Sequence, residues 1–347
     1  MARRLSPWLI GPLLLAGLLG AFLIALGSGY LEFTPEEILR VFWTKAGGDL
    51  ASLDPSRVMA LWEVRLPRIL TSILAGAALA LSGVVFQGLL HNPLADPYTL
   101  GVSSGAALGA ALAITASIFL PGNAFLANPL VPTLGAFLVA VLTLGLVVAL
   151  ARDRQGGLPP TRLILAGVIL AAILSAALSF LKYLAGDQVS SLVFWLLGSF
   201  QARSWLDAGL VGVFLLPALL VCLVYAPDLN LMTLGSGTAR TLGVDTGRVR
   251  FRLLAAASLA AAAAVAVAGI IGFVGLIVPH LVRLASGPDH RSLIPLATLG
   301  GGLLLLLADS LVRVVLPGEI PVGVVTALLA GPAFLVLFRR RMAGVEE

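Results

Sequence analysis

The sequence predicts an all-α integral membrane protein with about ten transmembrane helices and both termini in the cytoplasm. Hydrophobic residues make up 59% of the 347 residues and charged residues only 11%, whereas a soluble domain carries about a quarter charged residues. The apolar residues gather in runs of about 20, which is the helix length that crosses the hydrocarbon core. The alternating pattern of an outer-membrane barrel is absent from the sequence. Helices are then expected, because each satisfies its own backbone polar groups inside lipid.

The apolar runs follow one another with short polar breaks. The first run is too long for the apolar core of a signal peptide, and many runs follow it, so we expect a retained first helix. The eighth run is the weakest, because a proline and polar residues leave it few apolar positions. The ten candidate spans are residues 8–28, 66–90, 98–120, 129–151, 162–185, 205–226, 251–270, 271–285, 293–315 and 321–338.

The distribution of basic residues predicts the orientation. If the spans alternate from a cytoplasmic N-terminus, most arginines fall on one side with few acids, whereas the other side receives most of the acidic residues. The positive-inside rule therefore places both termini in the cytoplasm, and an even number of spans agrees. The arginines on the inner side are Arg3, Arg4, Arg152, Arg154, Arg162, Arg240, Arg248, Arg250, Arg252, Arg283, Arg291 and Arg339 to Arg341. The net charge of +5 is spread between spans, so it indicates membrane topology and no nucleic-acid partner.

Two loops are too long to be simple connections. The periplasmic loop 29–64 contains Thr34-Pro35, a typical helix start with proline at the first position. The cytoplasmic segment 229–250 predicts a short helix that ends at Gly243, followed by Asp245 as a cap of the next helix. With no linker or soluble second domain evident, we expect residues 1–347 to form one polytopic domain.

The sequence offers no cofactor, metal or nucleotide site. Neither of its two lysines, Lys45 and Lys182, follows a glycine, which excludes a phosphate-binding G-K-[S/T] loop. The three histidines lack metal-helix spacing, and the one cysteine, Cys222, lies in an apolar run. We therefore expect a protein that is not an enzyme and needs another chain to hydrolyse ATP if ATP drives it.

Three patterns of small, polar or charged residues have both a structural and a functional interpretation. Gly101, Gly105 and Gly109, with Ser103 nearby, share one helix face, which either packs closely on another helix or lines a wide path. The polar stretch 92–97 is either a tight turn or a gate, since irregular backbone at membrane depth is tolerated along a cavity. A third pattern is formed by Asp309 and Arg313, which are four residues apart and can pair.

Several long motifs resemble one known family. The segment RLPRILTSILAGAALALSGVVFQGLLHNPLADPYTLGVSSGAALG at 65–109 is similar to a signature of FecCD-type permeases, the membrane subunits of type II ABC importers for iron-siderophore, haem or cobalamin. The segments at 270–284, 306–313 and 319–340 resemble the C-terminal half of this family, and 229–244 resembles its cytoplasmic coupling segment. Ser236-Gly237 departs from the acidic residues that relatives often carry there.

This resemblance implies a homodimer in the inner membrane, in contact with lipid, with two ATPase subunits and a periplasmic or lipid-anchored substrate-binding protein. It also implies roles for single residues. Docking of the binding protein falls to Arg65, Arg68 and Arg313, whose guanidiniums we expect to be exposed. The cytoplasmic gate corresponds to Asn92, Leu94, Pro160 and Thr161. The ATPase-coupling residues correspond to Leu234, Ala239, Arg240, Leu242 and Gly243.

The resemblance leaves the cargo open among ferric siderophore, haem and cobalamin, with ferric siderophore first. The competing interpretation is an ion-coupled secondary transporter. Such proteins place ionisable groups near the middle of the bilayer, whereas here the charges gather at the ends of the spans.

Overall fold

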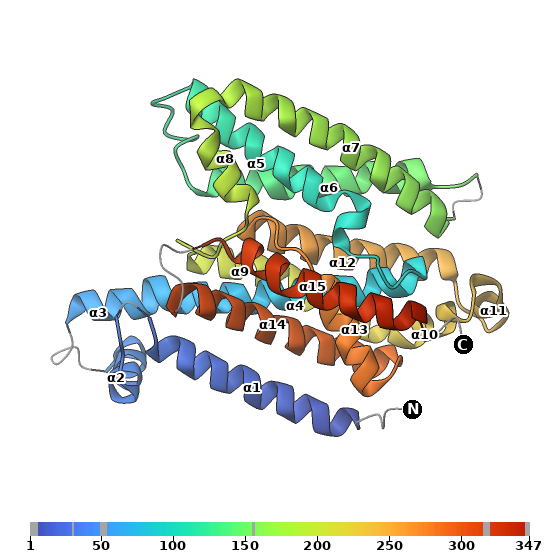
Figure 1. Cartoon of the computed structure of the whole chain (residues 1–347), viewed down its shortest axis with the longest axis horizontal. Helices are drawn as coiled ribbons and strands as arrows, with labels where there is room; N and C mark the ends of the chain where they lie inside the picture. The colour runs from blue at the N-terminus through green and yellow to red at the C-terminus, as the bar shows by residue number, and fades with distance from the viewer. Residues whose placement is uncertain (1–5, 30, 49–53, 155–156, 315–319, 344–347) are drawn as a thin grey trace.

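The computed structural model describes residues 6–29, 31–48, 54–154, 157–314 and 320–343, with side chains up to residue 332. Within these residues the chain is helical and has no strand (Figure 1). Eight helices are long and apolar enough to cross a membrane; of two further apolar helices one has 13 residues, and the other has side chains described only for residues 322–332. In chain order the ten are α1 (Pro7–Gly27), α4 (Leu66–Leu90), α5 (Val102–Phe119), α6 (Leu130–Ala151), α7 (Pro160–Ala185), α9 (Trp205–Val224), α12 (Thr246–Ala268), α13 (Val274–Ser286), α14 (His290–Val314) and α15 (Val322–Ala343).

The ends of the helices agree with the predicted orientation. Helix α1 begins and α15 ends on one side of the molecule, where the short helices α10 (Ala226–Thr233) and α11 (Ser236–Thr241) also lie (Figure 1). The opposite side carries α2 (Pro35–Lys45) and α3 (Pro55–Met59). The first of these sides is the cytoplasmic one, by the positive-inside rule. The side chains of Arg3, Arg4 and Arg339 to Arg341 lie outside the described residues.

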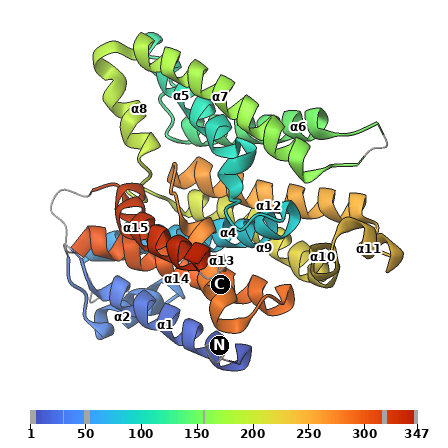
Figure 2. The ribbon, with the colours of Figure 1, turned by 45° about the vertical axis from the view of Figure 1, so that its right-hand side comes forward.

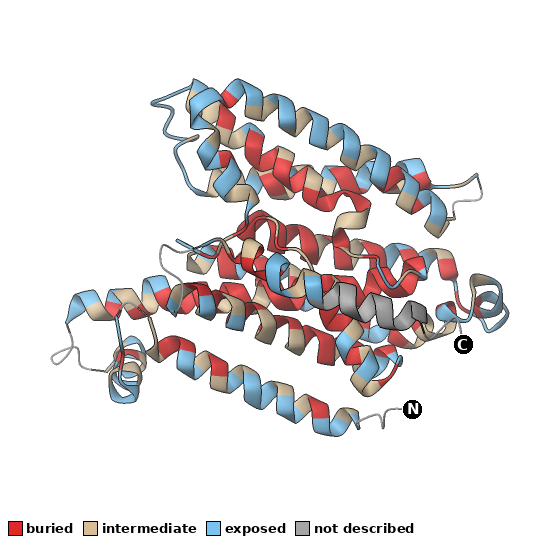
Figure 3. Ribbon diagram, viewed as in Figure 1, coloured by how far each residue is buried: buried red, intermediate tan, exposed pale blue. Residues whose placement is uncertain are grey.

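Helix α4 forms the centre of the molecule, and nearly all of its side chains are buried (Figure 3). Helices α9, α12, α13 and α14 pack around it. The helices approach closely because glycines meet at their crossings: a Cβ added to Gly76 would overlap the carbonyl of Gly301, and one added to Gly83 would overlap that of Gly275. Small residues at such crossings let helix backbones touch, which replaces the hydrophobic driving force that lipid does not supply.

The predicted eighth span is wrong as a complete crossing. Helix α13 has 13 residues, or about 20 Å of helix, and it begins near the middle of α4, where Gly275 meets Gly83. The preceding residues 269–273 are not helical. Part of their backbone is satisfied by other segments, since the Tyr98 hydroxyl donates to the Ile271 carbonyl at 2.5 Å. Irregular backbone is tolerated at this depth where the protein buries it.

The outer helices expose apolar side chains on the surface of the subunit. Helix α7 is the least buried of the long helices and continues through a 3₁₀ turn into α8 (Val189–Leu196), which the sequence analysis did not predict. Helices α5, α6, α7 and α8 form a layer above the group centred on α4 (Figure 2). This layer packs on the rest through contacts of α12 with α5 and α6.

The helix ends predicted in the two long loops are confirmed. Thr34 caps α2 through a capping box with Glu37, whose carboxylate accepts from the Thr34 N–H at 2.9 Å. On the cytoplasmic side α11 ends before Gly243, whose φ of +88° favours glycine. Asp245 caps α12 by accepting from the Arg248 N–H at 3.1 Å.

Candidate functional site

Helix α4 ends in a tight, hydrogen-bonded turn at residues 91–96. His91 closes the helix in the left-handed region with φ of +50°. The side-chain oxygen of Asn92 accepts from the Leu94 N–H at 2.9 Å, and its carbonyl accepts from the Ala95 N–H at 3.0 Å. Asp96 then caps the following 3₁₀ turn with Thr99. The 91–96 turn is therefore held by its own polar groups and leaves Leu94 exposed.

The 91–96 turn is joined directly to α10. The Nε2 atom of His91 lies 2.9 Å from the carbonyl oxygen of Met232, to which it donates. One turn earlier on α4, Gly88 provides a close approach, since a Cβ there would lie 3.1 Å from a methyl of Leu229. Any displacement of α10 therefore acts on the last turns of α4.

Helix α10 is also joined to the start of α14 through Asn230. Its side-chain oxygen accepts from the backbone N–H of His290 at 2.9 Å and from Nδ1 of the same residue at 2.7 Å. Its amide nitrogen donates to the Asp289 carboxylate at 2.7 Å, which fixes the orientation of the amide. His290 consequently carries a proton on Nδ1. Its Nε2 is buried and has no hydrogen-bond partner among the residues that the structure describes.

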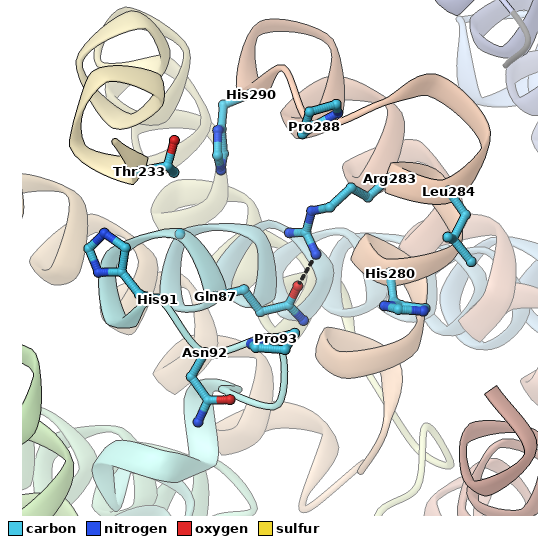
Figure 4. Close-up of a pocket in the computed structure, with 11 residues that line it drawn as sticks. Gln87, His91, Asn92, Pro93, Thr233, His280, Arg283, Leu284, Pro288 and His290 are labelled. Carbon is cyan, nitrogen blue, oxygen red and sulfur yellow. Dashed lines mark hydrogen bonds between the residues drawn. The ribbon is translucent and has the colours of Figure 1, made fainter. Parts of the chain in front are cut away.

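A hollow of about 610 Å³ lies where α4, α10, α13 and α14 meet (Figure 4). Arg283 reaches into it from α13 and donates to the Gln87 side-chain oxygen at 2.9 Å. All three histidines of the chain line the hollow, a grouping that the sequence analysis missed because they lie far apart in sequence. Among the described residues no three potential metal ligands come together. The lining residues are Gln87, Gly88, His91, Asn92, Pro93, Thr233, His280, Arg283, Leu284, Pro288 and His290.

The predicted coupling residues lie on α11 and directly before and after it. Leu234 and Leu242 are exposed by 66% and 57%, so each is an apolar side chain that the subunit itself leaves uncovered. Ala239 is fully buried, whereas Arg240 is exposed and donates from Nε to the Thr246 hydroxyl at 3.0 Å. The segment therefore has a packed inner side and an apolar outer side.

The three arginines predicted for docking are not exposed guanidinium groups. Arg65 is 8% and Arg68 is 7% exposed. Arg65 donates to the carbonyls of Leu26 and Leu31, both at 2.6 Å, and thus binds the C-terminal end of α1. Arg68 pairs with Asp309 at 2.9 Å. The sequence pointed instead to Arg313 as the partner of Asp309.

Arg313 joins the same end of α1. Its Nη2 donates to the carbonyl of Ala25 at 2.7 Å. The C-terminal end of α1 is therefore bound by arginines from two other helical segments.

The glycine face of α5 packs on neighbouring helices. A Cβ on Gly109 would overlap the carbonyl of Gly135 in α6, and one on Gly105 would overlap the Thr143 side chain. Gly101 precedes α5 with φ of +75°, and Ser103 is buried. These contacts favour the packing interpretation of the motif.

The other two residues predicted for the gate start α7. Pro160 is its first residue, and Thr161 is exposed beside it on the cytoplasmic side.

Comparisons with known proteins match nearly the whole chain to transport permeases. The profile of the FecCD transport family matches residues 17–340. A hemin transport system permease protein of Yersinia pestis is 39% identical over 96% of this chain and 97% of its own. A vitamin B12 import system permease protein of Klebsiella pneumoniae is also 39% identical, over 97% of this chain and 95% of its own. A solved structure of an ABC transporter assigned to the metal-chelate type, in an inward-facing conformation, matches with a TM-score of 0.81 and 34% identity over 95% of this chain and 99% of its own.

Proposed function

The chain belongs to the FecCD transport family, the membrane permease subunits of ABC importers, and we propose that it forms the translocation path for a ferric siderophore complex. It is a multi-pass protein of the inner membrane. Two copies form the path, two separate ATPase subunits supply the energy, and a periplasmic or lipid-anchored binding protein delivers the cargo. Helix α7, which exposes most of its length, is available to face the second copy.

The observation that carries this proposal is the connection between α10 and the 91–96 turn. An importer must convert movement of an ATPase into opening of a path. Here α10 contacts the turn through His91 and Met232, and the exposed Leu242 beyond α11 suits a cleft on another protein. A short helix held at both ends passes on a rigid-body movement to the helices it joins.

The proposed cytoplasmic gate consists of Asn92 and Leu94 on the turn and of Pro160 and Thr161 at the start of α7. Leu94 and Thr161 are both exposed on the cytoplasmic side. When two copies assemble, these residues close the path at its inner end. The ATP-driven movement of α10 would then shift the 91–96 turn and open it.

Docking of the binding protein remains assigned to the outer cluster of Arg65, Arg68 and Arg313. Because the first two are buried, docking requires acidic residues of the partner to take over their present hydrogen bonds. Charge reversal at Arg65 should weaken association with the binding protein, and more so at low ionic strength, where salt screens the long-range attraction to acidic residues of the partner least. Association that is unchanged at low salt, in a variant that unfolds like the wild type, would remove this role from Arg65.

Ferric siderophore is the first choice of cargo. Support comes from the relationship to a transporter of the metal-chelate type, while the hemin and vitamin B12 permeases among the relatives keep haem and cobalamin as competitors. Specificity depends mainly on the binding protein. Titration of the cognate binding protein with the three ligand classes tests the choice, and a partner that binds only cobalamin would overturn it.

Uptake into sealed vesicles separates this proposal from an ion-coupled secondary transporter. Vesicles that contain the assembled importer and ATP, without any ion gradient, should accumulate the cargo. Transport that needs a proton or sodium gradient and ignores ATP would establish the competing function. The position of Arg68 and Asp309, near the outer ends of α4 and α14, favours the ATP-driven importer because ion-coupled carriers place such groups near the midplane.

A further inference from the structure

A basic hollow lies at the cytoplasmic ends of α6 and α12, away from the 91–96 turn. Its volume is about 570 Å³. It is lined by three arginines, Arg152 just after α6, Arg240 on α11 and Arg248 in the first turn of α12. All three are exposed. Figure 2 shows these ends of α6 and α12 on the same side as α11.

Two acidic residues share the hollow and take up only part of its positive charge. Asp245 pairs with Arg248 at 3.2 Å, but both side chains are more than half exposed, so the pair is weak. One oxygen of Asp153 accepts from the Gly157 N–H at 2.6 Å. Arg250 adds a further positive charge beside the hollow, held by the Leu158 carbonyl at 2.8 Å. The hollow therefore has an excess of arginine over carboxylate and suits an anion.

An apolar groove begins where the basic hollow ends. It has a volume of about 230 Å³ and lies between α6 and α12. Phe251 lines both the hollow and the groove, so the two meet at its ring. The groove is lined only by apolar side chains and one glycine, namely Val141, Leu144, Gly145, Val148, Phe251, Ala255 and Leu259.

The hollow and the groove follow one another along α6 and α12. From Arg152 back to Val141, and from Arg248 on to Leu259, each helix advances 11 residues, or about 16 Å at 1.5 Å per residue. The hydrocarbon core of one leaflet is about 15 Å deep, half of the full 30 Å. A charged head at the arginines and a chain along the groove thus span one leaflet.

Gly145 keeps the groove open. A Cβ built on this glycine has no atom within 4 Å, so the space beside it is free of protein. The glycines that pack helices together behave differently, since a Cβ on Gly135 of the same helix would lie 2.8 Å from the Gly109 carbonyl. A side chain at position 145 would project into this space and fill part of the groove.

We propose that this site binds an anionic phospholipid of the cytoplasmic leaflet, with its phosphate at Arg152, Arg240 and Arg248 and one acyl chain between α6 and α12. Basic pockets between helices on the cytoplasmic side attract anionic headgroups, and Arg forks match phosphate oxygens. Because α11 contributes Arg240, the bound lipid joins α6 and α12 to the segment assigned to ATPase coupling. The site does not depend on the identity of the cargo.

Native mass spectrometry of the purified full chain in neutral detergent tests the site. Phosphatidylglycerol should bind with one-to-one stoichiometry, and phosphatidylcholine with the same chains should bind at least tenfold more weakly. Arg152→Gln and Arg248→Gln should each weaken phosphatidylglycerol binding about fivefold, the effect expected for one basic residue at an anionic surface. Arg291→Gln, an exposed cytoplasmic arginine outside the hollow, is the matched control and should have no effect.

Gly145→Phe tests the groove separately from the charges. It should lower phosphatidylglycerol binding about tenfold without unfolding the protein, because the ring enters free space. Gly209→Phe is the control, since Gly209 is also an exposed helical glycine with no atom within 4 Å of a Cβ. A photoreactive phosphatidylglycerol with a diazirine in its chain should label residues 141–148 and 251–259.

Three results would overturn the proposal. Equal binding of both lipids, unaffected by the arginine variants, would make the groove a place for bulk lipid only. Glycerol 3-phosphate that binds as tightly as the lipid, with Gly145→Phe unaffected, would make the hollow a site for soluble anions. Arginine variants that lose the ATPase subunit but bind phosphatidylglycerol normally would assign the hollow to protein contact.

Discussion

Arg68 and Asp309 form a buried ion pair between α4 and α14 although they are 241 residues apart in sequence. The Nε atom of Arg68 lies 3.1 Å from each carboxylate oxygen, and Nη2 lies 2.9 Å from Oδ1. Both side chains are at most 9% exposed. The pair fixes the outer ends of the two helices, and it withdraws from solvent an arginine that the sequence assigns to docking.

The first prediction is that Asp309→Asn destabilises the protein. Removing one partner leaves an uncompensated buried charge, which typically costs about 3–5 kcal/mol. The unfolding temperature of the purified subunit should fall markedly. The double variant Arg68→Met with Asp309→Leu should recover most of the loss, because two apolar side chains replace the pair without leaving a charge behind.

The pair between Arg40 and Glu36 on α2 is the control for that experiment, because it is exposed and only four residues apart. Glu36→Gln should leave the unfolding temperature almost unchanged. If Asp309→Asn and Glu36→Gln behave alike, the buried pair does not hold α4 to α14.

The second prediction concerns Asn230, which connects α10 to α14. Asn230→Ala removes the acceptor of the two His290 N–H groups and the donor to Asp289. Loss of these three hydrogen bonds, each of about 0.5–1.5 kcal/mol, should lower coupled uptake at least about fivefold while the ATPase subunit stays bound and hydrolyses ATP. The ratio of cargo transported to ATP hydrolysed is the quantity to measure.

Thr233→Val is the control for Asn230→Ala, because the Thr233 hydroxyl bonds only within α10 in the contacts described, to the Asn230 carbonyl. It should keep the wild-type ratio. An unchanged ratio for Asn230→Ala would show that the contact to α14 is not used in transmission.

The third prediction tests the gate. Cys222 is the one cysteine of the chain and is buried, so Cys222→Ala gives a background without reactive thiols. In that background Asn92→Cys or Thr161→Cys should crosslink between two copies in one nucleotide state and not in another. Equal crosslinking with and without ATP would count against a gate at these positions.

The sequence predicts best those features that depend on interactions between residues close together in the chain. The helix start at Thr34-Pro35 and the cap at Asp245 were predicted, and the hydrogen-bond partners of Thr34 and Asp245 lie three residues away. The start of α13 was not predicted; there Gly275 packs against Gly83 on another helix, a contact that the local sequence does not reveal.

The burial of Arg65 and Arg68 has the same kind of origin. From the sequence, an arginine next to an apolar run is expected to lie at the membrane surface. The α1 carbonyl that binds Arg65 and the Asp309 carboxylate that binds Arg68 come close only in the folded structure. The histidine-lined hollow was not predicted either, since His91 and His290 come together only through the packing of α4, α10 and α14. The sequence thus predicted which helices exist better than which polar groups they share.

The fourth prediction uses the closest helix crossing. Gly83→Ala should destabilise the protein by about 1–3 kcal/mol, the usual effect of overpacking, because its Cβ would overlap the Gly275 carbonyl and backbone cannot move aside easily. Gly20→Ala in α1, where no atom lies within 4 Å of a Cβ, should be neutral or slightly stabilising. Comparable unfolding temperatures for the two variants would refute close packing at the α4–α13 crossing.

The fifth prediction concerns Leu242, which follows α11 and is 57% exposed. An exposed apolar side chain between Thr241 and Gly243 stabilises nothing within the subunit, so its burial has to come from a partner. Leu242→Asp places a charge in that contact and should either release the ATPase subunit or uncouple hydrolysis from transport. Docking of the binding protein on the opposite side should be unaffected.

Ala239 would be the wrong position for this test, because it is fully buried in the subunit and a charge there would disturb folding. If Leu242→Asp transports at the wild-type rate with its ATPase bound, the α11 segment does not couple the two subunits.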